Sequence, residues 1–251
     1  MSKENNNSHA GHRERMLEKY LKSGFNAFPD HELFEILLYG VMRRVNTNEL
    51  GHALIEKFGS IRGVLNASHD ELIGVPGIGD KAAMNISLVA ELMRRYYTST
   101  CDREKFGTVD KVGSFFVHKY IGESNEAVYA MLLTNSLGFI DCRRICEGNI
   151  NSSKLEIDKI CKYAYSRQAS KVIIAHNHPG GVLIPSDDDR KATTYLLQAL
   201  DLLGIKLIEH FIIVENTYLP IMRNSGNGAL KRISEEALPF EDIEYVTGKV
   251  K

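Results

Sequence analysis

The segment 171–189 combines residue types that bind transition metals. His176 and His178 are one residue apart and directly follow the apolar, β-branched run 171–175, which predicts a short buried strand. Residues i and i+2 of an extended segment point to the same side, so both imidazoles leave the strand end together. Ser186 then begins an expected helix, and Asp189 falls in its first turn, from which it can fold back toward the histidines. Two neutral imidazoles and one carboxylate, with one position left open, form the ligand set of a catalytic zinc site.

Each of these residues also has a simpler interpretation. Ser186 and Asp189 before an apolar helix match a capping box, which needs no metal. His176 and His178 alone could form a polar strand end. Taken together, at the spacing that a metal requires from the cap, the residues favour a metal site. The two interpretations are compatible, because a metal-bound Asp189 leaves Ser186 free to accept a hydrogen bond from a backbone amide.

The spacing around these residues is also that of a known motif. The pattern His-x-His-Pro-x6-Ser-x2-Asp is matched position for position by His176, His178, Pro179, Ser186 and Asp189. It resembles the JAMM motif of JAB/MPN metallopeptidases, whose members hydrolyse peptide or isopeptide bonds. The run His-Asn-His-Pro-Gly-Gly and the segment 203–214 are similar to the bacterial RadC family, which is historically associated with DNA repair. The resemblance extends from about Gly11 to about Pro220.

This resemblance implies a fold, a cofactor and residue roles. The implied fold is a layered α/β domain of the α+β JAB/MPN type, similar to cytidine deaminases, and the implied cofactor is Zn²⁺. By the resemblance, His176, His178 and Asp189 are the zinc ligands and Ser186 holds the oxyanion. An upstream glutamate is the implied general base.

Three glutamates are candidates for that base, which must lie near the metal to take and return a proton. Glu126 is preferred because it immediately precedes the expected strand 127–133, as the family glutamate precedes its first sheet strand. Glu123 and Glu147 are the alternatives. Any of the three could equally be a solvated carboxylate at a strand end.

Composition limits the class of protein. The chain has 251 residues, which suits one large domain or two smaller ones, and a net charge of −1, so no charge excess predicts a partner. Its polar N-terminus lacks the apolar core of a signal peptide. No apolar stretch approaches the roughly 20 residues that span a bilayer. The four cysteines form no Cys-x-x-Cys pair, which favours free thiols in a reducing cytoplasm. We therefore expect a cytoplasmic protein without a membrane partner.

Hydrophobic periodicity changes once along the chain. Apolar residues at three- and four-residue steps predict helices up to about Tyr97, whereas later segments alternate between strand and helix patterns. The expected fold class is therefore an α/β layered domain with a smaller all-α N-terminal domain. The expected division is a disordered N-terminus 1–10, a helical domain 11–97, a linker 98–107, the layered domain 108–222 and a flexible tail 223–251.

A second motif lies in the helical part. The segment 72–83, with the sequence Leu-Ile-Gly-Val-Pro-Gly-Ile-Gly-Asp-Lys-Ala-Ala, resembles the helix-hairpin-helix element of DNA-binding proteins. Gly77 and Gly79 would let a tight turn expose backbone amides at a helix start, where a phosphate oxygen binds, and Lys81 adds a cation. Such contacts position a protein on DNA without reading its sequence. The alternative is a turn that only packs two helices, and no basic face accompanies the motif.

Several functions are compatible with these motifs. The first is a zinc-dependent hydrolase of the JAMM type that cleaves amide bonds of a peptide or protein and docks to the DNA backbone through its helical domain. The second is a nucleic-acid-binding adaptor with a structural or dormant metal site. Two histidines and a carboxylate also bind non-haem iron, and a metal-dependent nuclease is a further alternative. Ser186 and the first-turn Asp189 favour zinc hydrolysis, because oxygenases need neither. The sequence predicts no particular substrate and no oligomeric state.

Overall fold

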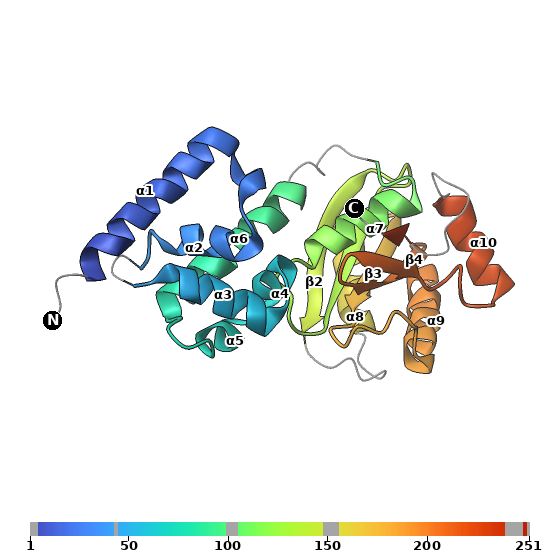
Figure 1. Ribbon diagram of the computed structural model, residues 1–251. Coiled ribbons are helices and arrows are strands. Elements are labelled where there is room, and N and C mark those ends of the chain that lie inside the picture. Colours follow the sequence, from blue (N-terminus) through green and yellow to red (C-terminus); the bar gives the residue numbers. More distant parts are fainter. Residues whose placement is uncertain (1–4, 43–44, 99–104, 148–155, 239–247, 250–251) are drawn as a thin grey trace. The chain divides into compact units, whose positions relative to one another are not determined.

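The computed structural model describes residues 5–42, 45–98, 105–147, 156–238 and 248–249 (Figure 1). The chain divides into two compact units, Met1–Leu92 and Met93–Lys251. The boundary falls within helix α6 (Asp80–Thr98), so helical structure continues to the start of the predicted linker 98–107. Residues 99–104 of that linker lie outside the described residues.

The first unit is helical, as the periodicity predicts. Its elements are α1 (Asn5–Ser23), the 3-10 helix η1 (Phe25–Ala27), α2 (Asp30–Leu38), α3 (Thr47–Phe58), α4 (Ile61–Asn66), α5 (His69–Ile73) and the start of α6. The buried carboxylate of Glu35 joins three of these helices, because it accepts hydrogen bonds from His12, Tyr39 and Asn48. Ser68 and Glu71 form the predicted capping box of α5.

The N-terminal helix corrects one expectation. Residues 5–10, predicted to be disordered with the rest of segment 1–10, belong to α1, while residues 1–4 lie outside the described part. Each residue added to an existing helix gains one backbone hydrogen bond. The polar segment therefore continues the helix that the periodic pattern after Gly11 begins.

The second unit is an α/β layered domain, which confirms the expected fold class. Its elements are α7 (Val109–Lys119), β1 (Ala127–Leu133), β2 (Phe139–Glu147), α8 (Ile157–Ser166), β3 (Lys171–Asn177), α9 (Asp187–Asp201), β4 (Lys206–Val214), β5 (Thr217–Pro220), α10 (Gly228–Ala237) and β6 (Gly248–Lys249). The described strands form one sheet in the order β2-β1-β3-β4-β5-β6. Strands β3 and β4 are parallel and joined by α9, while the other pairs are antiparallel.

The sheet has two apolar faces. On the α7 face, side chains of α7 pack against β1 residues such as Tyr129 and Met131. On the α9 face, side chains of α8 and α9 pack against Val128 and Ala130 of β1 and against Ile174 of β3. Alternate residues of a strand face opposite sides. The alternation of β3 therefore places His176 on the α9 face, two residues after Ile174.

A bulge in β4 changes which face its residues reach. The pairing of β3 with β4 skips Ile208, which is an extra residue on β4. Leu207 belongs to the α9 face, yet His210, three residues later, contacts His176 on that same face. Ile208 and Phe211 both belong to the α7 face, with the same three-residue separation. Residues three apart in a regular strand face opposite sides, so the bulge turns His210 toward the site.

The buried carboxylate of Glu209 supports this bulge. Its Oε1 accepts the amides of His210 at 2.7 Å and Met222 at 2.8 Å, and its Oε2 accepts the Ser234 hydroxyl at 2.5 Å. The guanidinium of Arg223 lies 3.8 Å from Oε2. Glu209 therefore provides acceptors for donors on β4, on the segment after β5 and on α10.

The C-terminal segment corrects a second expectation. Arg223, assigned from sequence to a flexible tail 223–251, is buried and donates to the Ser234 hydroxyl and to the carbonyls of Ser234 and Leu238. Leu238 is fully buried in the α7-face core. The physical reason is the buried carboxyl group of Glu209, which accepts the Ser234 hydroxyl and lies 3.8 Å from Arg223, so that β4 is linked to α10. Residues 239–247 and 250–251 of the predicted tail lie outside the described residues. None of the helices in the described part of the chain is long and apolar enough to span a bilayer.

Replacing Glu209 by Gln tests this anchor through the pH dependence of stability. Burial raises the pKa of Glu209 from 4.5 to about 7, although its hydrogen bonds and Arg223 lower it. A folded-state pKa above the unfolded value means that the Glu209 contribution is fully present below pH 4.5 and is lost as pH rises to about 7. We expect the stability of the parent relative to Glu209→Gln to fall by at most about 3 kcal/mol across this interval. Urea denaturation at several pH values measures the difference in unfolding free energy between the two proteins. A difference that does not change with pH would contradict the prediction.

Candidate metal centre

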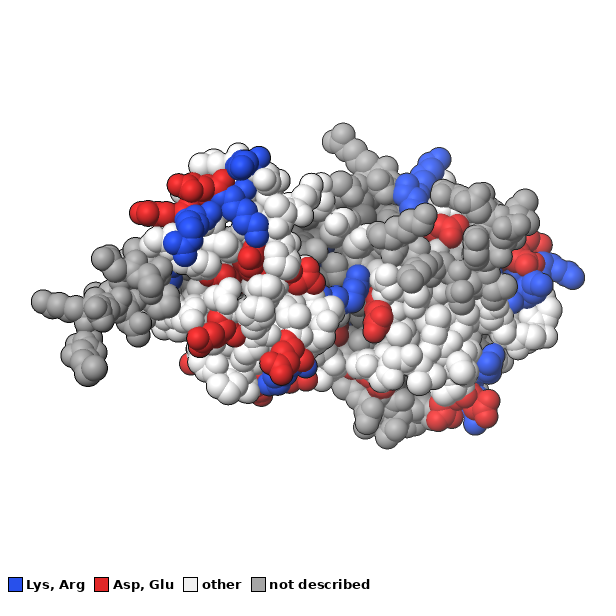
Figure 2. Space-filling model, in the orientation of Figure 1, with Lys and Arg blue, Asp and Glu red and all other residues white. Residues whose placement is uncertain are grey.

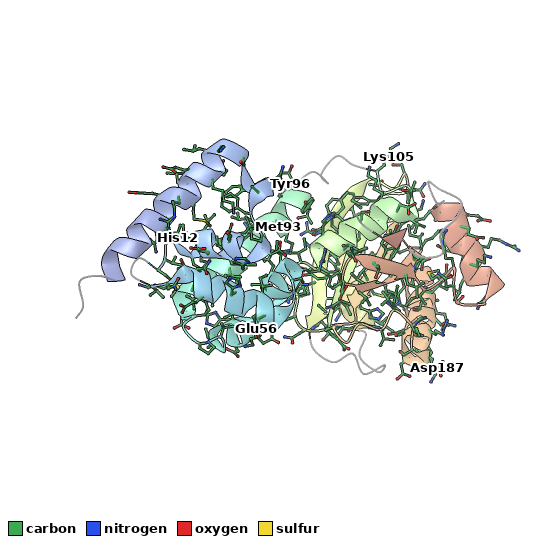
Figure 3. The ribbon with its side chains drawn as sticks, viewed as in Figure 1. His12, Glu56, Met93, Tyr96, Lys105 and Asp187 are labelled. Atoms are coloured by element: carbon green, nitrogen blue, oxygen red, sulfur yellow. The ribbon has the colours of Figure 1, made fainter. Side chains whose placement is uncertain are left out.

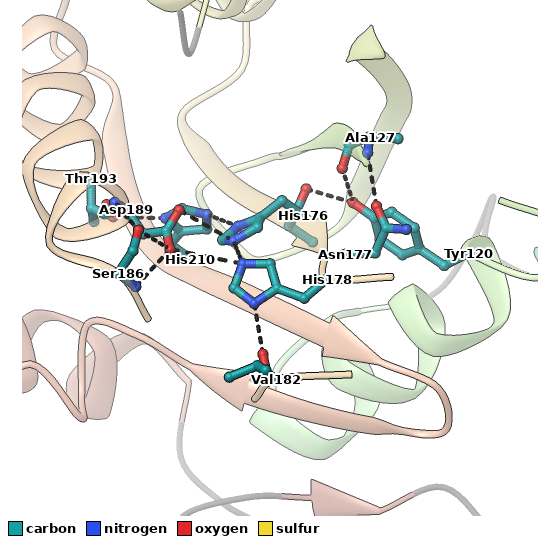
Figure 4. Close-up of polar contacts among 11 residues, drawn as sticks. Tyr120, Ala127, His176, Asn177, His178, Val182, Ser186, Asp189, Thr193 and His210 are labelled. Carbon is teal, nitrogen blue, oxygen red and sulfur yellow. Dashed lines mark hydrogen bonds and ion pairs between the residues drawn. The ribbon is translucent and has the colours of Figure 1, made fainter. Parts of the chain in front are cut away.

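Three elements bring the predicted ligands together at the C-terminal end of β3. His176 is the second-last residue of β3 and is 2% exposed, His178 follows the strand, and Asp189 lies in the first turn of α9 (Figure 4). The Nε2 atoms of His176 and His178 are 2.9 Å apart. His176 Nε2 lies 3.3 Å from Asp189 Oδ1, and His178 Nε2 lies 3.8 Å from Asp189 Oδ2. The structure thus converges all three predicted ligands.

The loop between β3 and α9 positions His178. The amide of His178 donates to the carbonyl of Ile213 at 3.0 Å, which continues the pairing of β3 with β4 by one residue. Its Nδ1 lies 2.7 Å from the carbonyl oxygen of Val182. The turn between them contains Gly181 with a φ of 79°, a conformation that favours glycine. His178 is therefore held on both sides, with Nε2 directed to the site.

The start of α9 positions Asp189. Helix α9 begins at Asp187 (Figure 3), and its N-cap Ser186 forms a capping box with Asp189. Asp189 Oδ2 accepts the amide of Ser186 at 2.8 Å and its hydroxyl at 2.7 Å, while Ser186 Oγ accepts the amide of Asp189 at 3.1 Å. The predicted cap and the predicted ligand are therefore one structure. Oδ1 is the carboxylate oxygen nearer to His176.

The geometry and the chemistry of these atoms fit a zinc ion. Ligand atoms of a tetrahedral site with bonds of about 2.0–2.1 Å are about 3.3 Å apart. His176 Nε2 lies 2.9 Å from His178 Nε2 and 3.3 Å from Asp189 Oδ1, and one ligand atom from each of the three residues lies within 4.8 Å of the other two. Within the described residues, His176, His178 and Asp189 are the group of three side chains close enough to share a metal. Burial lowers the pKa of His176 to about 4, against the opposing charge of Asp189. His176 is therefore neutral at neutral pH, as a metal ligand must be.

The candidate bases lie in different surroundings. Glu123 accepts the Tyr129 hydroxyl at 2.5 Å and pairs with Arg144 at 3.1 Å. Tyr129 belongs to the α7 face, so these contacts hold Glu123 away from the ligands. The side chain of Glu147 lies outside the described residues. Glu126 is partly buried and immediately precedes β1.

The side chain of Asn177 forms hydrogen bonds with the residues immediately before and after Glu126. Its Oδ1 accepts the amide of Ala127 at 2.8 Å, and its Nδ2 donates to the carbonyl of Asn125 at 3.0 Å (Figure 4). The side chain between the two histidines therefore attaches the end of β3 to the backbone on both sides of Glu126. Val128 pairs with His176 in the sheet register. The backbone of Glu126 is thus held close to the metal ligands.

Sequence reasoning missed three polar residues of this centre. Asn177, Thr193 and His210 are each buried, and Thr193 and His210 are 1% exposed. A signal for Asn177 was present, since it is the middle residue of His-x-His. Thr193 lies one helical turn after Asp189, which puts it on the same side of α9. His210 gave no local signal, because the bulge and the parallel pairing bring it to His176.

The structure places Gly77, Gly79 and Lys81 in and after the turn between α5 and α6. Gly77 has a φ of 90°, which favours glycine. Lys81 is exposed in the first turn of α6, but Asp80 beside it is 87% exposed and brings a negative charge to the same helix start. On the face of this unit drawn in Figure 2, basic and acidic side chains are interspersed. Contact of these three residues with DNA therefore stays a prediction.

The fold and the site together define a JAB-type domain with a cluster of two histidines and one aspartate that could hold a metal ion. The chain matches the RadC-like JAB domain family over residues 106–226 and the UPF0758 N-terminal family over residues 8–84. The protein therefore belongs to the RadC family, which confirms the resemblance seen in the sequence.

Curated relatives match most of the chain. A UPF0758 protein of Fusobacterium nucleatum is 30% identical over 220 residues, which are 84% of this chain and 95% of the relative. A UPF0758 protein of Vibrio campbellii is 32% identical over 197 residues, 78% of this chain and 88% of the relative. A UPF0758 protein of Pseudoalteromonas atlantica is 30% identical over 201 residues, which are 80% of this chain and 90% of the relative. The names of these relatives state no activity.

Ser186→Ala separates the cap from the ligand support. We expect a loss of about 1 kcal/mol in unfolding free energy, the usual value of an N-cap, together with weaker zinc binding, because Asp189 loses a hydroxyl donor. Ser68→Ala is the matched control, since Ser68 forms the same capping box with Glu71 in the first unit. It should reduce stability similarly and leave zinc affinity unchanged. Equal zinc affinity in both variants would show that Ser186 acts as a cap only. Thermal melting and chelator competition measure the two effects.

Gly79→Val tests the predicted DNA contact. A Cβ added at Gly79 meets no atom within 4 Å, so the fold should tolerate the change, whereas the added side chain would obstruct an approaching phosphate. We expect weak, salt-sensitive DNA binding by the parent and a further loss in Gly79→Val. Fluorescence anisotropy at two salt concentrations measures it, with circular dichroism as the folding control. Unchanged binding by the folded variant would make the turn purely structural.

Proposed function

We propose that this protein is a zinc-dependent hydrolase that cleaves amide bonds, in the manner of JAMM metallopeptidases, in a peptide or protein substrate. The observation that carries the proposal is the convergence of His176, His178 and Asp189 within ligand–ligand distances at the end of β3. Three protein ligands leave a fourth tetrahedral position open, as in catalytic rather than structural zinc sites. Membership of the RadC-like JAB family supports the same chemistry.

A zinc ion bound there supplies a Lewis acid and lowers the pKa of its bound water. We assign the general base to Glu126. Continued by one step, the alternation of β1 predicts that Glu126 lies on the same face as Val128, which is the face of His176 and Asp189. Asn177 holds the backbone on both sides of it. Glu126 would accept a proton during attack on the amide carbonyl and return it to the departing amine.

We assign Ser186 to the developing oxyanion. Its hydroxyl lies at the edge of the ligand group and donates to Asp189 Oδ2 at 2.7 Å. Because a serine hydroxyl has a single proton, stabilising an oxyanion requires it to turn away from Asp189. Its oxygen would still accept the Asp189 amide, so the cap survives that rotation. Hydrogen bonds of this kind contribute about 10²–10³ to turnover.

The variant Glu126→Gln tests the proposal. The change keeps the size of the side chain but cannot accept a proton, so the protein should bind one zinc per chain and lose about 10²–10⁴ in hydrolysis. Elemental analysis gives the zinc content, and a library of fluorogenic peptide and isopeptide substrates gives the activity. Glu123→Gln is the matched control, because Glu123 is held on the α7 face by Tyr129 and Arg144.

The outcomes distinguish the competing functions. Stoichiometric iron in place of zinc would favour oxygen chemistry, and cleavage of phosphodiesters but not amides would favour a nuclease. Full activity in Glu126→Gln would exclude Glu126 as the base. Loss of zinc in that variant would instead make Glu126 a ligand. A parent protein that binds zinc and cleaves no member of the library would favour the adaptor.

A further inference from the structure

A line of buried hydrogen bonds begins at His176 Nδ1, the ring nitrogen that does not face His178 (Figure 4). His176 Nδ1 lies 2.7 Å from His210 Nε2. His210 Nδ1 lies 2.7 Å from Thr193 Oγ1, and Thr193 Oγ1 lies 2.6 Å from the backbone carbonyl oxygen of Asp189. The line therefore begins at the ring of one proposed ligand and ends at the backbone of another, across β3, β4 and α9.

The last acceptor fixes the direction of every bond in this line. A carbonyl oxygen can only accept, so the hydroxyl proton of Thr193 points to Asp189. Thr193 has no second proton, and its oxygen must accept from His210 Nδ1–H. A neutral His210 then has a lone pair at Nε2, which accepts from His176 Nδ1–H. The reverse direction would leave the Asp189 carbonyl facing a hydroxyl oxygen at 2.6 Å without a proton between them.

This direction determines which nitrogen of His176 faces the ligand group without a proton. A neutral imidazole carries one proton, so with Nδ1 protonated, Nε2 presents a lone pair. The same reasoning applies to His178, whose Nδ1 donates to the Val182 carbonyl. The two Nε2 atoms, 2.9 Å apart, therefore present lone pairs to each other. A cation held between them makes this arrangement favourable, and Asp189, 3.3 Å from His176 Nε2, supplies a balancing negative charge.

We propose that Thr193 and His210 are positioning residues for the metal: their hydrogen bonds to the Asp189 carbonyl and to His176 hold the His176 ring in the Nδ1–H tautomer, with Nε2 prepared for zinc. The inference rests on the proposed metal site and deepens it. Outer hydrogen bonds to metal ligands commonly change metal affinity 10–100-fold. Here the outer partner is a second histidine, whose own tautomer is set by a threonine.

Thr193→Val is the informative variant. Valine has the shape of threonine but cannot accept from His210 Nδ1–H. A proton on His210 Nδ1 then has no acceptor, so the tautomer with the proton on Nε2 is favoured. His176 must then accept that proton's hydrogen bond at Nδ1 and carry its own proton on Nε2, where zinc would bind. We expect zinc affinity, measured on the full chain by chelator competition with Zn²⁺ alone, to fall 10–100-fold. Thr193→Ser restores the hydroxyl and should restore the affinity.

The neighbouring residue provides a matched control. Thr194 lies on the same helix, and its hydroxyl donates to the carbonyl of Arg190 at 3.0 Å, but it is exposed. Thr194→Val removes the same kind of hydrogen bond and should leave zinc affinity unchanged. Thermal melting of both valine variants separates a change in stability from a change in affinity.

The tautomer itself can be observed without a variant. In ¹⁵N-histidine spectra of the metal-free parent, we expect His176 to carry its proton on Nδ1, and in Thr193→Val on Nε2. A parent His176 protonated on Nε2 would overturn the inference, as would a folded Thr193→Val protein with parental zinc affinity. Failure of the proposed function has a different signature, because a parent without zinc or amide hydrolysis can still show the Nδ1–H tautomer.

Discussion

The capping box at the start of α9 is the interaction on which the candidate metal centre depends. The first amides of any helix lack intrahelical partners, and here Ser186 and Asp189 satisfy two of them reciprocally. The same exchange fixes the carboxylate of Asp189, with Oδ2 occupied by donors and Oδ1 nearer to His176. Helix stability and ligand placement are therefore not separate properties. The carboxylate cannot leave its position at the site without also removing the cap.

The surroundings of this carboxylate show how a polar centre is tolerated inside an apolar sheet. His176, Thr193 and His210 are almost completely buried, and an unpartnered polar group there would cost about 1–3 kcal/mol. Each of them has partners on neighbouring elements, and the series ends on the Asp189 backbone carbonyl. The polar groups thus satisfy one another between β3, β4 and α9. The ring nitrogen of His176 that this series leaves unused, Nε2, faces His178 and Asp189.

Local signals in the sequence were sufficient for the fold class and for the clustering of His176, His178 and Asp189, because His-x-His, the capping box and the change in periodicity each act over a few residues. The parts that sequence could not predict depend on long-range pairing. His210 is 34 residues from His176 and reaches it only through the parallel register and the bulge. Arg223 resembled part of a polar tail, since its burial depends on Glu209, which precedes it by a whole strand and turn. Leu238 was assigned to the flexible tail for the same reason, because its burial depends on the anchoring of α10.

The bulge at Ile208 determines which side chains of β4 face α9 and which face α7. If β4 paired regularly with β3 while keeping all its residues, every side chain beyond Ile208 would change face. Phe211 would then project toward His176 and His210 would enter the apolar core under α7. Glu209 opposes such a slip, because its carboxylate holds the amides of His210 and Met222 in the bulged arrangement. A carboxylate bound to α10 thereby determines which side chain β4 presents to the metal centre.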